Sequence, residues 1–322
     1  IKTNFTHQLL KKILIKNYSF FSKLFHKITL GNKYNLNLFF DLEKFFYLNK
    51  NWEYYNNEHI FICGLARSGS TILLNYLIQN HTYTSLNYDD VPMILSPNLF
   101  KYFKKKFKSP FRKKISRYHQ DGLSIDLDTP EAFEEVFWKF IFNNNYINNK
   151  FLERNIINEY KINEFKKFLS LILIKNKKNL YISKNNNNLL RVNYLKKYLN
   201  NSKFLIPFRH PLQQSISLLE QHKNFYNIQK NNSFALKYMN YIGHHEFGAN
   251  QKSFKLEESY KNPFNKNSLN FWLYDWHHVY SNIFFFFFLN KNVYFVIFVF
   301  FCEILDFYIK KIKLKKIYNK IF

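Results

Sequence analysis

Gly64-Leu-Ala-Arg-Ser-Gly-Ser-Thr71 is the stretch that decides the fold of this 322-residue chain. Apolar, β-prone residues occupy 59–63 before it, and residues 72–79 after it carry apolar side chains at helical spacing. Its glycines and final hydroxyl are spaced as in the phosphate-binding loop of nucleoside triphosphatases, but Ser70 stands where those enzymes have lysine. A loop that joins a strand to a helix N-terminus presents backbone N–H groups and the positive end of the helix dipole to an anion. The stretch therefore predicts a phosphate cradle without the lysine that nucleoside triphosphate hydrolysis needs.

Side chains of this 64–71 loop add to the predicted anion site. Arg67 supplies a full positive charge, and the hydroxyl groups of Ser68, Ser70 and Thr71 supply donors. The backbone N–H of Gly69 belongs to the group that would point at the anion. A chance Gly/Ser turn is the alternative, and the strand before the loop and the helix after it argue against that alternative.

A second basic and hydroxyl-bearing cluster follows later in the chain. Residues 202–209 have the pattern of a buried strand that ends in Arg209, and a helix is predicted over 212–223. Pro211 stands at the first helical position, where its missing N–H costs nothing. Ser217 lies two turns into this helix. The strand end and the helix can therefore bring Arg209 and Ser217 to one anion.

Together the two clusters resemble the sulfotransferase family, and the arginine in the 64–71 loop is similar to that of its bacterial members. The resemblance implies a central parallel α/β sheet flanked by helices, and 3′-phosphoadenosine 5′-phosphosulfate (PAPS) as the sulfate donor. It implies that the loop holds the 5′-phosphosulfate and that Arg209 and Ser217 hold the 3′-phosphate. The implied activity is metal-independent transfer of a sulfuryl group to a hydroxyl or amine. Carbohydrate, lipid headgroup, small alcohol and peptide tyrosine all stay open as the acceptor.

Two further stretches extend the resemblance over about residues 59–280. Tyr181-Ile-Ser-Lys-Asn185 is similar to the family's approach to the 3′-phosphate arginine, which implies that Lys184 lies near the nucleotide. Tyr88-Asp-Asp-Val-Pro92 follows the loop where related enzymes carry an acidic residue that faces the acceptor. The chain has no segment similar to the C-terminal Gly-x-x-Gly-x-Trp-Lys of the cytosolic members.

Sulfuryl transfer passes through a loose transition state, so that positioning and charge stabilisation supply most of the catalysis. Arg67 and the hydroxyls of Ser70 and Thr71 would neutralise charge on the leaving phosphate oxygen. A carboxylate must take the acceptor's proton. Asp90 is the first candidate and Asp89 the second, with a turn-forming pair of aspartates as the alternative. The reserve candidates are His119, Asp121, Glu134 and Glu135.

The composition indicates an ordered α/β chain, because 47% of the residues are hydrophobic. The formal net charge of +26 points to an anionic partner. However, the chain is rich not only in Lys but also in Asn, Phe, Tyr and Ile, with 39 Phe and 24 Tyr. These residues share A/T-rich codons, so we attribute most of the charge to genome composition. The cation-dense run at 101–114 either attracts an anionic acceptor or forms a solvated helix face.

The strand, turn and helix pattern recurs from 59 to 223 and predicts a parallel sheet with crossover helices. We expect an N-terminal helical extension at 1–58 and a sulfotransferase-like α/β domain at 59–322. An insertion at about 86–175 is the candidate acceptor pocket, because open α/β sheets bind ligands beyond the carboxyl ends of their strands. Within it, Thr129-Pro130 predicts the start of a helix at Glu131.

Cysteine usage and hydropathy predict a cytoplasmic protein. Cys63 and Cys302 are far apart in sequence, so neither a disulfide framework nor a zinc site is indicated. No signal peptide is visible, although the chain begins at Ile1 and a missing start stays open. The apolar runs after residue 282 are shorter than the roughly 20 residues that a bilayer span needs. Val293–Phe301 is predicted to be a buried strand.

Two stretches carry weaker signals. His244 and His245 are adjacent and have no third ligand in place, so we expect no metal site. The phenylalanine run at 284–288 and the lysine-rich tail differ from what the resemblance implies after Ser281, and a reading-frame slip would explain the difference.

Two other functions compete with sulfuryl transfer. A kinase or nucleotide hydrolase would need a phosphate-binding lysine and a metal-binding aspartate at a strand end, where this chain has Arg209. A non-enzymatic protein that binds nucleic acid or a membrane surface would leave the 64–71 loop without a purpose. We therefore expect a sulfotransferase with no nucleic-acid partner and no transmembrane segment, of undetermined oligomeric state.

Overall fold

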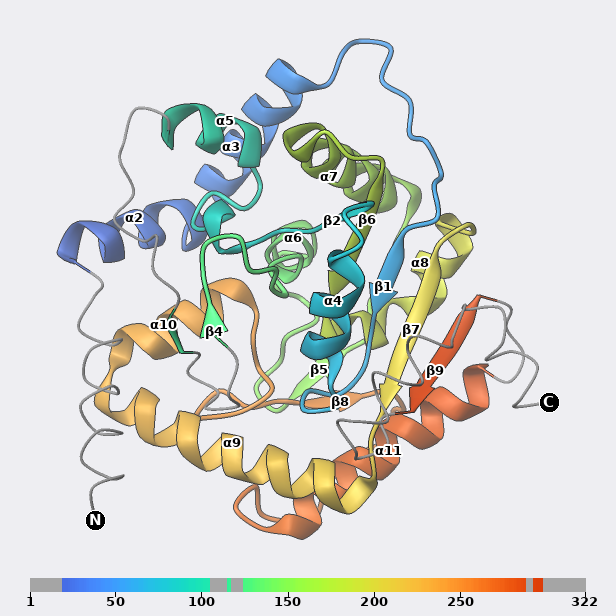
Figure 1. Ribbon diagram of the computed structural model, residues 1–322. Helices are drawn as coiled ribbons and strands as arrows, with labels where there is room; N and C mark the ends of the chain where they lie inside the picture. Colours follow the sequence, from blue (N-terminus) through green and yellow to red (C-terminus); the bar gives the residue numbers. More distant parts are fainter. Residues whose placement is uncertain (1–18, 105–114, 117–123, 288–291, 298–322) are drawn as a thin grey trace.

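The structure is a computed structural model that describes residues 19–104, 115–116, 124–287 and 292–297 of the chain. In this part of the chain, a parallel sheet with helices on both faces forms the centre of the molecule (Figure 1). The predicted fold class, a parallel α/β sheet flanked by helices, is confirmed.

The central sheet contains five parallel strands in the order β2-β6-β1-β7-β9 within the described residues. They are β1 (Ile60–Ile62), β2 (Tyr83–Thr84), β6 (Leu180–Lys184), β7 (Lys203–Phe208) and β9 (Val293–Ile297). Ile60 of β1 lies opposite Ile182 of β6 on one side and Lys203 of β7 on the other. A strand enclosed by two parallel neighbours and covered on both faces must be apolar throughout, which explains the sequence of β1.

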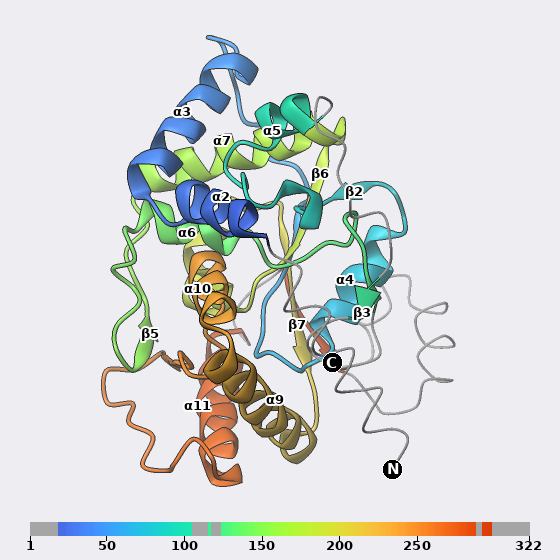
Figure 2. The same cartoon turned by 90° about the vertical axis from the view of Figure 1, so that its left-hand side faces the viewer.

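Helices and short strand pairs surround this sheet. The helices are α2 (Phe20–Leu30), α3 (Lys33–Tyr47), α4 (Ser70–Ile78), α5 (Pro97–Lys104), α6 (Glu135–Ile141), α7 (Glu159–Asn176), α8 (Val192–Tyr198), α9 (Pro211–Asn231), α10 (Ser233–Ile242) and α11 (Leu269–Phe287), with 3-10 turns η1 (Tyr88–Asp90) and η2 (Asn186–Leu190). The short strands are β3 (Ile115–Ser116) with β4 (Ser124–Ile125), which are antiparallel, and β5 (Phe151–Glu153) with β8 (Ser253–Lys255), which are parallel. Figure 2 shows α2, α3 and α5 at one end of the molecule and α9 and α11 at the other. No helix among the described segments has the length and apolar character to cross a membrane.

Alternate side chains of the sheet enter two separate apolar clusters. Ile60, Ile62 and Leu205 pack with the apolar side chains of α4 on one face. Phe61 and Phe204 lie on the opposite face, where their rings stack with centroids 5.4 Å apart. Successive side chains of a strand point to opposite faces, so the parallel register aligns each cluster. The second cluster also takes in α6, α7 and α8.

A buried ion pair ties α6 to the start of α8. Arg191 and Glu135 are 2% and 1% exposed and form a bidentate pair, with both N–O distances 2.7 Å. Asn185 and Tyr146 also donate to this carboxylate. Burial would raise the pKa of Glu135, but the charge of Arg191 and these hydrogen bonds outweigh burial, so the pKa is lowered. Glu135 is therefore ionised in the interior because Arg191 is there.

The N-terminal helices are joined to the rest of the fold by Glu43 of α3. Its fully buried carboxylate accepts from the backbone N–H groups of Asn98 and Leu99 at 2.7 and 2.9 Å, at the N-terminus of α5. A carboxylate at this position satisfies orphan donors and interacts favourably with the helix dipole. Phe40 of α3 is also part of the main apolar cluster.

The predicted helix start at Glu131 is wrong, because α6 begins at Glu135. The Thr129 hydroxyl donates to Asp126 Oδ1 at 2.7 Å and accepts from the Asp126 backbone N–H at 2.9 Å, so it closes the preceding turn. Pro130 forms an isolated bridge with Asn87. The turn residues that usually begin a helix here close a loop instead.

The C-terminal strand forms as predicted over its described part, Val293–Ile297, but the side chains of residues 293–296 are half-buried rather than buried. β9 pairs with β7 from Phe204 opposite Val293 to Phe208 opposite Ile297. Its described side chains are of intermediate exposure because β9 is an edge strand. Residues 298–301, Cys302 and the lysine-rich tail lie outside the described residues.

We predict that Arg191→Ala lowers the free energy of unfolding by about 3–5 kcal/mol, because it leaves Glu135 buried without its cation. Urea unfolding at neutral pH measures this, with Lys197→Ala on the exposed side of α8 as the control, expected within about 0.5 kcal/mol of the parent. Glu135 has a lowered pKa in the folded parent, so its stabilising contribution is lost as the pH falls through that pKa. The difference in the free energy of unfolding between the parent and Arg191→Ala should therefore become smaller at acid pH. A loss of less than about 1 kcal/mol in the free energy of unfolding at neutral pH would contradict a stabilising role for the Arg191–Glu135 ion pair.

Candidate functional site

The 64–71 loop makes a tight turn between β1 and α4. Arg67 and Gly69 have φ values of 65° and 91°, in the left-handed region. Glycine enters that region at no steric cost, whereas arginine rarely does. Gly69 directly precedes Ser70, the first residue of α4, and no side chain in the described residues caps this helix. The first-turn N–H groups are therefore available to an anion.

Strand β7 and helix α9 hold the loop from its other side. Gln214 of α9 donates through Nε2 to the Ala66 carbonyl at 2.9 Å, and Trp276 donates through Nε1 to Gln214 Oε1 at 3.0 Å. A Cβ at Gly64 would lie 3.3 Å from Pro207 Cδ, so the close approach of loop and strand favours glycine there. Sequence reasoning missed Gln214, because a single amide inside a helix has no motif that marks it.

Arg67, Ser217 and Arg209 lie together beside the loop. Arg67 Nε donates to Ser217 Oγ at 2.9 Å, and Arg209 Nη1 donates to the Arg67 carbonyl at 3.2 Å. Burial, and then the positive charge of Arg67, lower the pKa of Arg209. Two guanidinium groups side by side make an electropositive site. The residues that the sequence analysis took from two separate clusters are thus brought together.

Lys184 reaches the same loop from the end of β6. Its Nζ lies 3.1 Å from Thr71 Oγ1 and 2.6 Å from Glu131 Oε1. The carboxyl ends of parallel strands meet at one edge of a sheet, which explains why β1 and β6 both contribute here. Glu131 is a carboxylate linked to the loop that sequence reasoning assigned only to a helix start. In the sequence, only its position directly after Thr129-Pro130 drew attention to Glu131.

The Ser68 hydroxyl is a buried donor of the 64–71 loop. Ser68 is fully buried, and its Oγ has no hydrogen-bond partner in the part of the chain that the structure describes. A buried hydroxyl left without a partner is costly, so Ser68 is a point of the loop that a new hydrogen bond would stabilise. The loop N–H groups, this hydroxyl and Arg67 together suit a group with several anionic oxygens.

Glu134 and Glu135 lie in a buried network behind the site. Glu134 Oε1 accepts from Asn188 at 2.8 Å and from Trp138 Nε1 at 3.1 Å. Asn185, which follows Lys184, donates to Glu135 Oε2 at 2.8 Å. Both carboxylates are only 1% exposed. Their hydrogen bonds to Asn185 and Asn188 hold the segment that follows β6 in place.

Asp90 and Asp89 on η1 are each paired with a lysine. Asp90 is 1% exposed, forms an ion pair with Lys175 of α7, and accepts from the Asn87 backbone N–H at 3.0 Å. Burial raises its pKa, against the opposing charge of Lys175. Asp89 pairs with Lys104 of α5. Among the contacts of the described residues, none joins either aspartate to the 64–71 loop.

Other predicted features lie partly or wholly outside the described residues. His119 and Asp121 do so entirely. The basic run at 101–114 is described only to Lys104, and in it Lys101 Nζ donates to the Lys175 carbonyl at 2.9 Å. Within the described segments, no group of His, Cys, Asp or Glu side chains is arranged to hold a metal ion. His245 is buried, and burial lowers its pKa to about 4.

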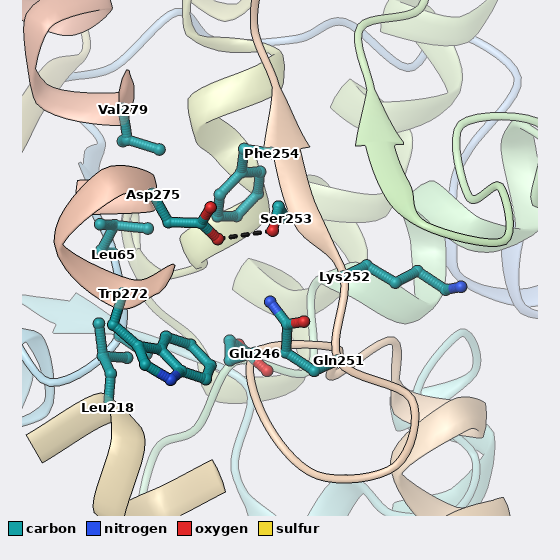
Figure 3. A pocket seen from close by; sticks show the side chains of 11 residues that line it. Leu65, Leu218, Glu246, Gln251, Lys252, Ser253, Phe254, Trp272, Asp275 and Val279 are labelled. Carbon is teal, nitrogen blue, oxygen red and sulfur yellow. Dashed lines mark hydrogen bonds between the residues drawn. The ribbon is translucent and has the colours of Figure 1, made fainter. Parts of the chain in front are cut away.

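A small cavity of about 30 Å³ adjoins the back of the loop (Figure 3). Leu65, Leu218, Trp272 and Asp275 are among the residues that line it. Asp275 accepts from Ser253 Oγ at 2.5 Å, as the dashed line in Figure 3 shows. A space of this size holds about one or two water molecules and no nucleotide base.

The sulfotransferase family model matches residues 59–253, which include the loop, Lys184, Arg209 and Ser217. No curated protein matches the chain. Two crystal structures are similar at low identity. The sulfotransferase STF1 from Mycobacterium tuberculosis H37Rv aligns over 83% of this chain and 69% of its own, with 10% identity and a TM-score of 0.46. The sulfotransferase STF9 from Mycobacterium avium aligns over 84% and 85%, with 11% identity and a TM-score of 0.39.

Proposed function

We propose a function for this chain from one premise: the chain belongs to the sulfotransferase family, whose model covers more than half of its length. It is therefore a sulfotransferase, with an acceptor substrate and a nucleotide sulfate donor of the kind that the family uses. We propose that the donor is PAPS and that the acceptor is a hydroxyl or amine. We further propose that 59–322 is the catalytic domain, 1–58 an extension, and 86–175 the acceptor side. The free thiol of the buried Cys63 supports a reducing, cytoplasmic setting.

The observation that carries this proposal is the convergence of Arg67, Ser217 and Arg209 at the N-terminus of α4. A nucleotide with phosphate groups at both the 5′ and the 3′ positions needs two anion sites a ribose apart. The loop supplies one through its N–H groups and Ser68. Arg209 and Ser217 would supply the other, and Arg67 lies between them.

In the proposed reaction, the bond between sulfur and the bridging phosphate oxygen breaks as a bond from sulfur to the acceptor oxygen or nitrogen forms. The bridging oxygen leaves with the electron pair, and the loop N–H groups with Arg67, Ser70 and Thr71 stabilise its charge. Lys184, held beside Thr71 Oγ1, adds a cation on the same side. The Arg67–Ser217 hydrogen bond would open when the donor's oxygens take its place.

For the general base we propose Glu131, with Asp90 and Asp89 as the competing carboxylates. Glu131 is supported by its link to the loop through Lys184 and Thr71. Asp90 has Lys175 as its partner instead, on the side of α7. In the proposed step, the carboxylate takes the acceptor's proton as the new bond to sulfur forms.

The first functional prediction concerns the donor. Adenosine 3′,5′-bisphosphate should bind at least about tenfold more tightly than ADP, because Arg209 and Ser217 need a 3′-phosphate to hold, and a charge-assisted hydrogen bond is worth about 1.5–3 kcal/mol. Calorimetric titration measures it. Arg209→Ala should remove the discrimination, whereas Arg154→Ala, on an arginine near Glu257, should keep it. Equal affinities in the parent protein, or a strict Mg²⁺ requirement for activity, would contradict the proposal.

The second functional prediction separates chemistry from binding. Arg67→Ala should lower turnover by about a hundredfold or more, as the loss of one preorganised donor to the transition state does. Arg209→Ala should mainly raise the KM for PAPS. Labelled PAPS, varied against a fixed acceptor fraction from a cell extract, gives both constants. An unchanged turnover number in Arg67→Ala would show that its role is in binding alone.

The third functional prediction concerns the base. Glu131→Gln should keep nucleotide affinity near normal and lower turnover by about 10²- to 10⁴-fold, because the amide cannot accept the acceptor's proton. Asp90→Asn should lower stability, since it leaves Lys175 buried without its anion, and should retain transfer in the folded protein. Asp89→Asn serves as the more exposed control. If Asp90→Asn abolishes transfer in a folded protein while Glu131→Gln is active, Asp90 is the base.

A further inference from the structure

Helix α2 exposes a continuous apolar face. Phe20, Phe21, Leu24, Phe25 and Ile28 are all exposed, with Phe21 at 78%. Their spacing puts them on one side of the helix. The side chains of α2 that are buried, His26, Thr29 and Leu30, lie on its opposite side. The wider apolar side of α2 therefore faces outward, whereas its buried side is partly polar.

Helix α3 repeats the arrangement beside it. Tyr34, Leu38, Leu42, Phe45 and Phe46 are exposed, with Phe45 at 79%, and they too follow one side of the helix. Its buried residues, Phe40 and Glu43, face the core and α5. Helices α2 and α3 contact each other, and both views show them at the periphery of the molecule, meeting at an angle (Figures 1 and 2).

Helix α5 extends the same surface. The ring of Phe25 on α2 lies 6.3 Å from that of Phe100 on α5, and Tyr102 and Phe103 are exposed beyond it. Here the "α2–α3–α5 face" means the exposed apolar side chains of these three helices. Exposed apolar side chains gathered on neighbouring helices are typical of an interaction site.

The charges on these helices are almost all positive. Lys23, Lys27, Lys33 and Lys101 are exposed, and Asp41 is the one exposed acid among the residues of α2, α3 and α5. Lys23 and Lys27 lie at helical positions that flank the apolar side of α2. A second copy of the chain docked through this face would bring the same lysines together, at a cost in electrostatic repulsion. An anionic occupant gains from them instead.

We propose that the α2–α3–α5 face binds the surface of an anionic lipid bilayer, with the aromatic side chains at the headgroup level and the lysines on the lipid phosphates and carboxylates. Helices with phenylalanine and leucine on one side and lysine at the flanks have the pattern of interfacial binding without spanning. Each lysine near the surface gains from the negative potential of anionic lipids. This inference stands independently of the proposed donor and mechanism.

Vesicle co-sedimentation of the full chain tests the proposal. The protein should bind vesicles of phosphatidylcholine with about 30 mol % phosphatidylserine, bind phosphatidylcholine alone much more weakly, and release as salt is raised. The double variant Phe21→Ser, Phe45→Ser should lower the partition constant by about tenfold or more. The matched control Tyr226→Ser, Phe264→Ser removes two exposed aromatic side chains, one on α9 and one in the segment before α11, and should bind within about twofold of the parent.

Three results would overturn the proposal. The first is a parent protein that binds neither kind of vesicle, and the second is a Phe21→Ser, Phe45→Ser variant that binds as the parent does. The third is a parent that is dimeric by light scattering while that double variant is monomeric, which would make a second copy the occupant. Circular dichroism of both double variants, expected to match the parent because the replaced side chains are exposed, keeps a folding defect from being mistaken for lost binding.

Discussion

The parallel pairing of β1 with β6 and β7 is the constraint on which the candidate site depends. Because the three strands run in the same direction, the segments that follow them meet at one edge of the sheet. Arg67 and Ser217 are 150 positions apart in sequence, yet their side chains are hydrogen-bonded. The entropic cost of closing so long a loop grows only slowly with its length. Burial of the apolar residues on both faces of β1 opposes that cost.

Features set by neighbouring residues could be predicted from the sequence. The strand, loop and helix at 59–79 and the helix that starts at Pro211 have local causes, namely apolar runs, glycine spacing and a proline at the first helical position. The start of α6 could not be predicted in this way. Thr129 can cap a helix or close a turn with Asp126, and the chain takes the second option. The choice depends on how Pro130 meets Asn87, which is a tertiary contact.

The partners of the carboxylates could not be predicted either, for an electrostatic reason. Asp90 is paired with a lysine 85 positions away, and Glu131 with a lysine 53 positions away. In a chain with 48 Lys and Arg residues and 22 Asp and Glu residues, nearly every acid has several cations that could reach it. A sequence therefore shows that a carboxylate exists, but the fold decides which cation it meets. Glu131 pairs with Lys184 and is thereby linked to the loop, whereas Asp90 pairs with Lys175 of α7.

The same charge balance bears on why an anion would be recognised at the loop. A lysine that already has a buried carboxylate beside it, as Lys175 has, would have to lose that partner before it bound a phosphate. At the loop, Arg209 lies beside another cation, Arg67, and the pKa of Arg209 is lowered by burial and then by the charge of Arg67. An anion bound beside two neighbouring guanidinium groups reduces the repulsion between them. Placing two cations side by side therefore favours the binding of an anion at this edge of the sheet.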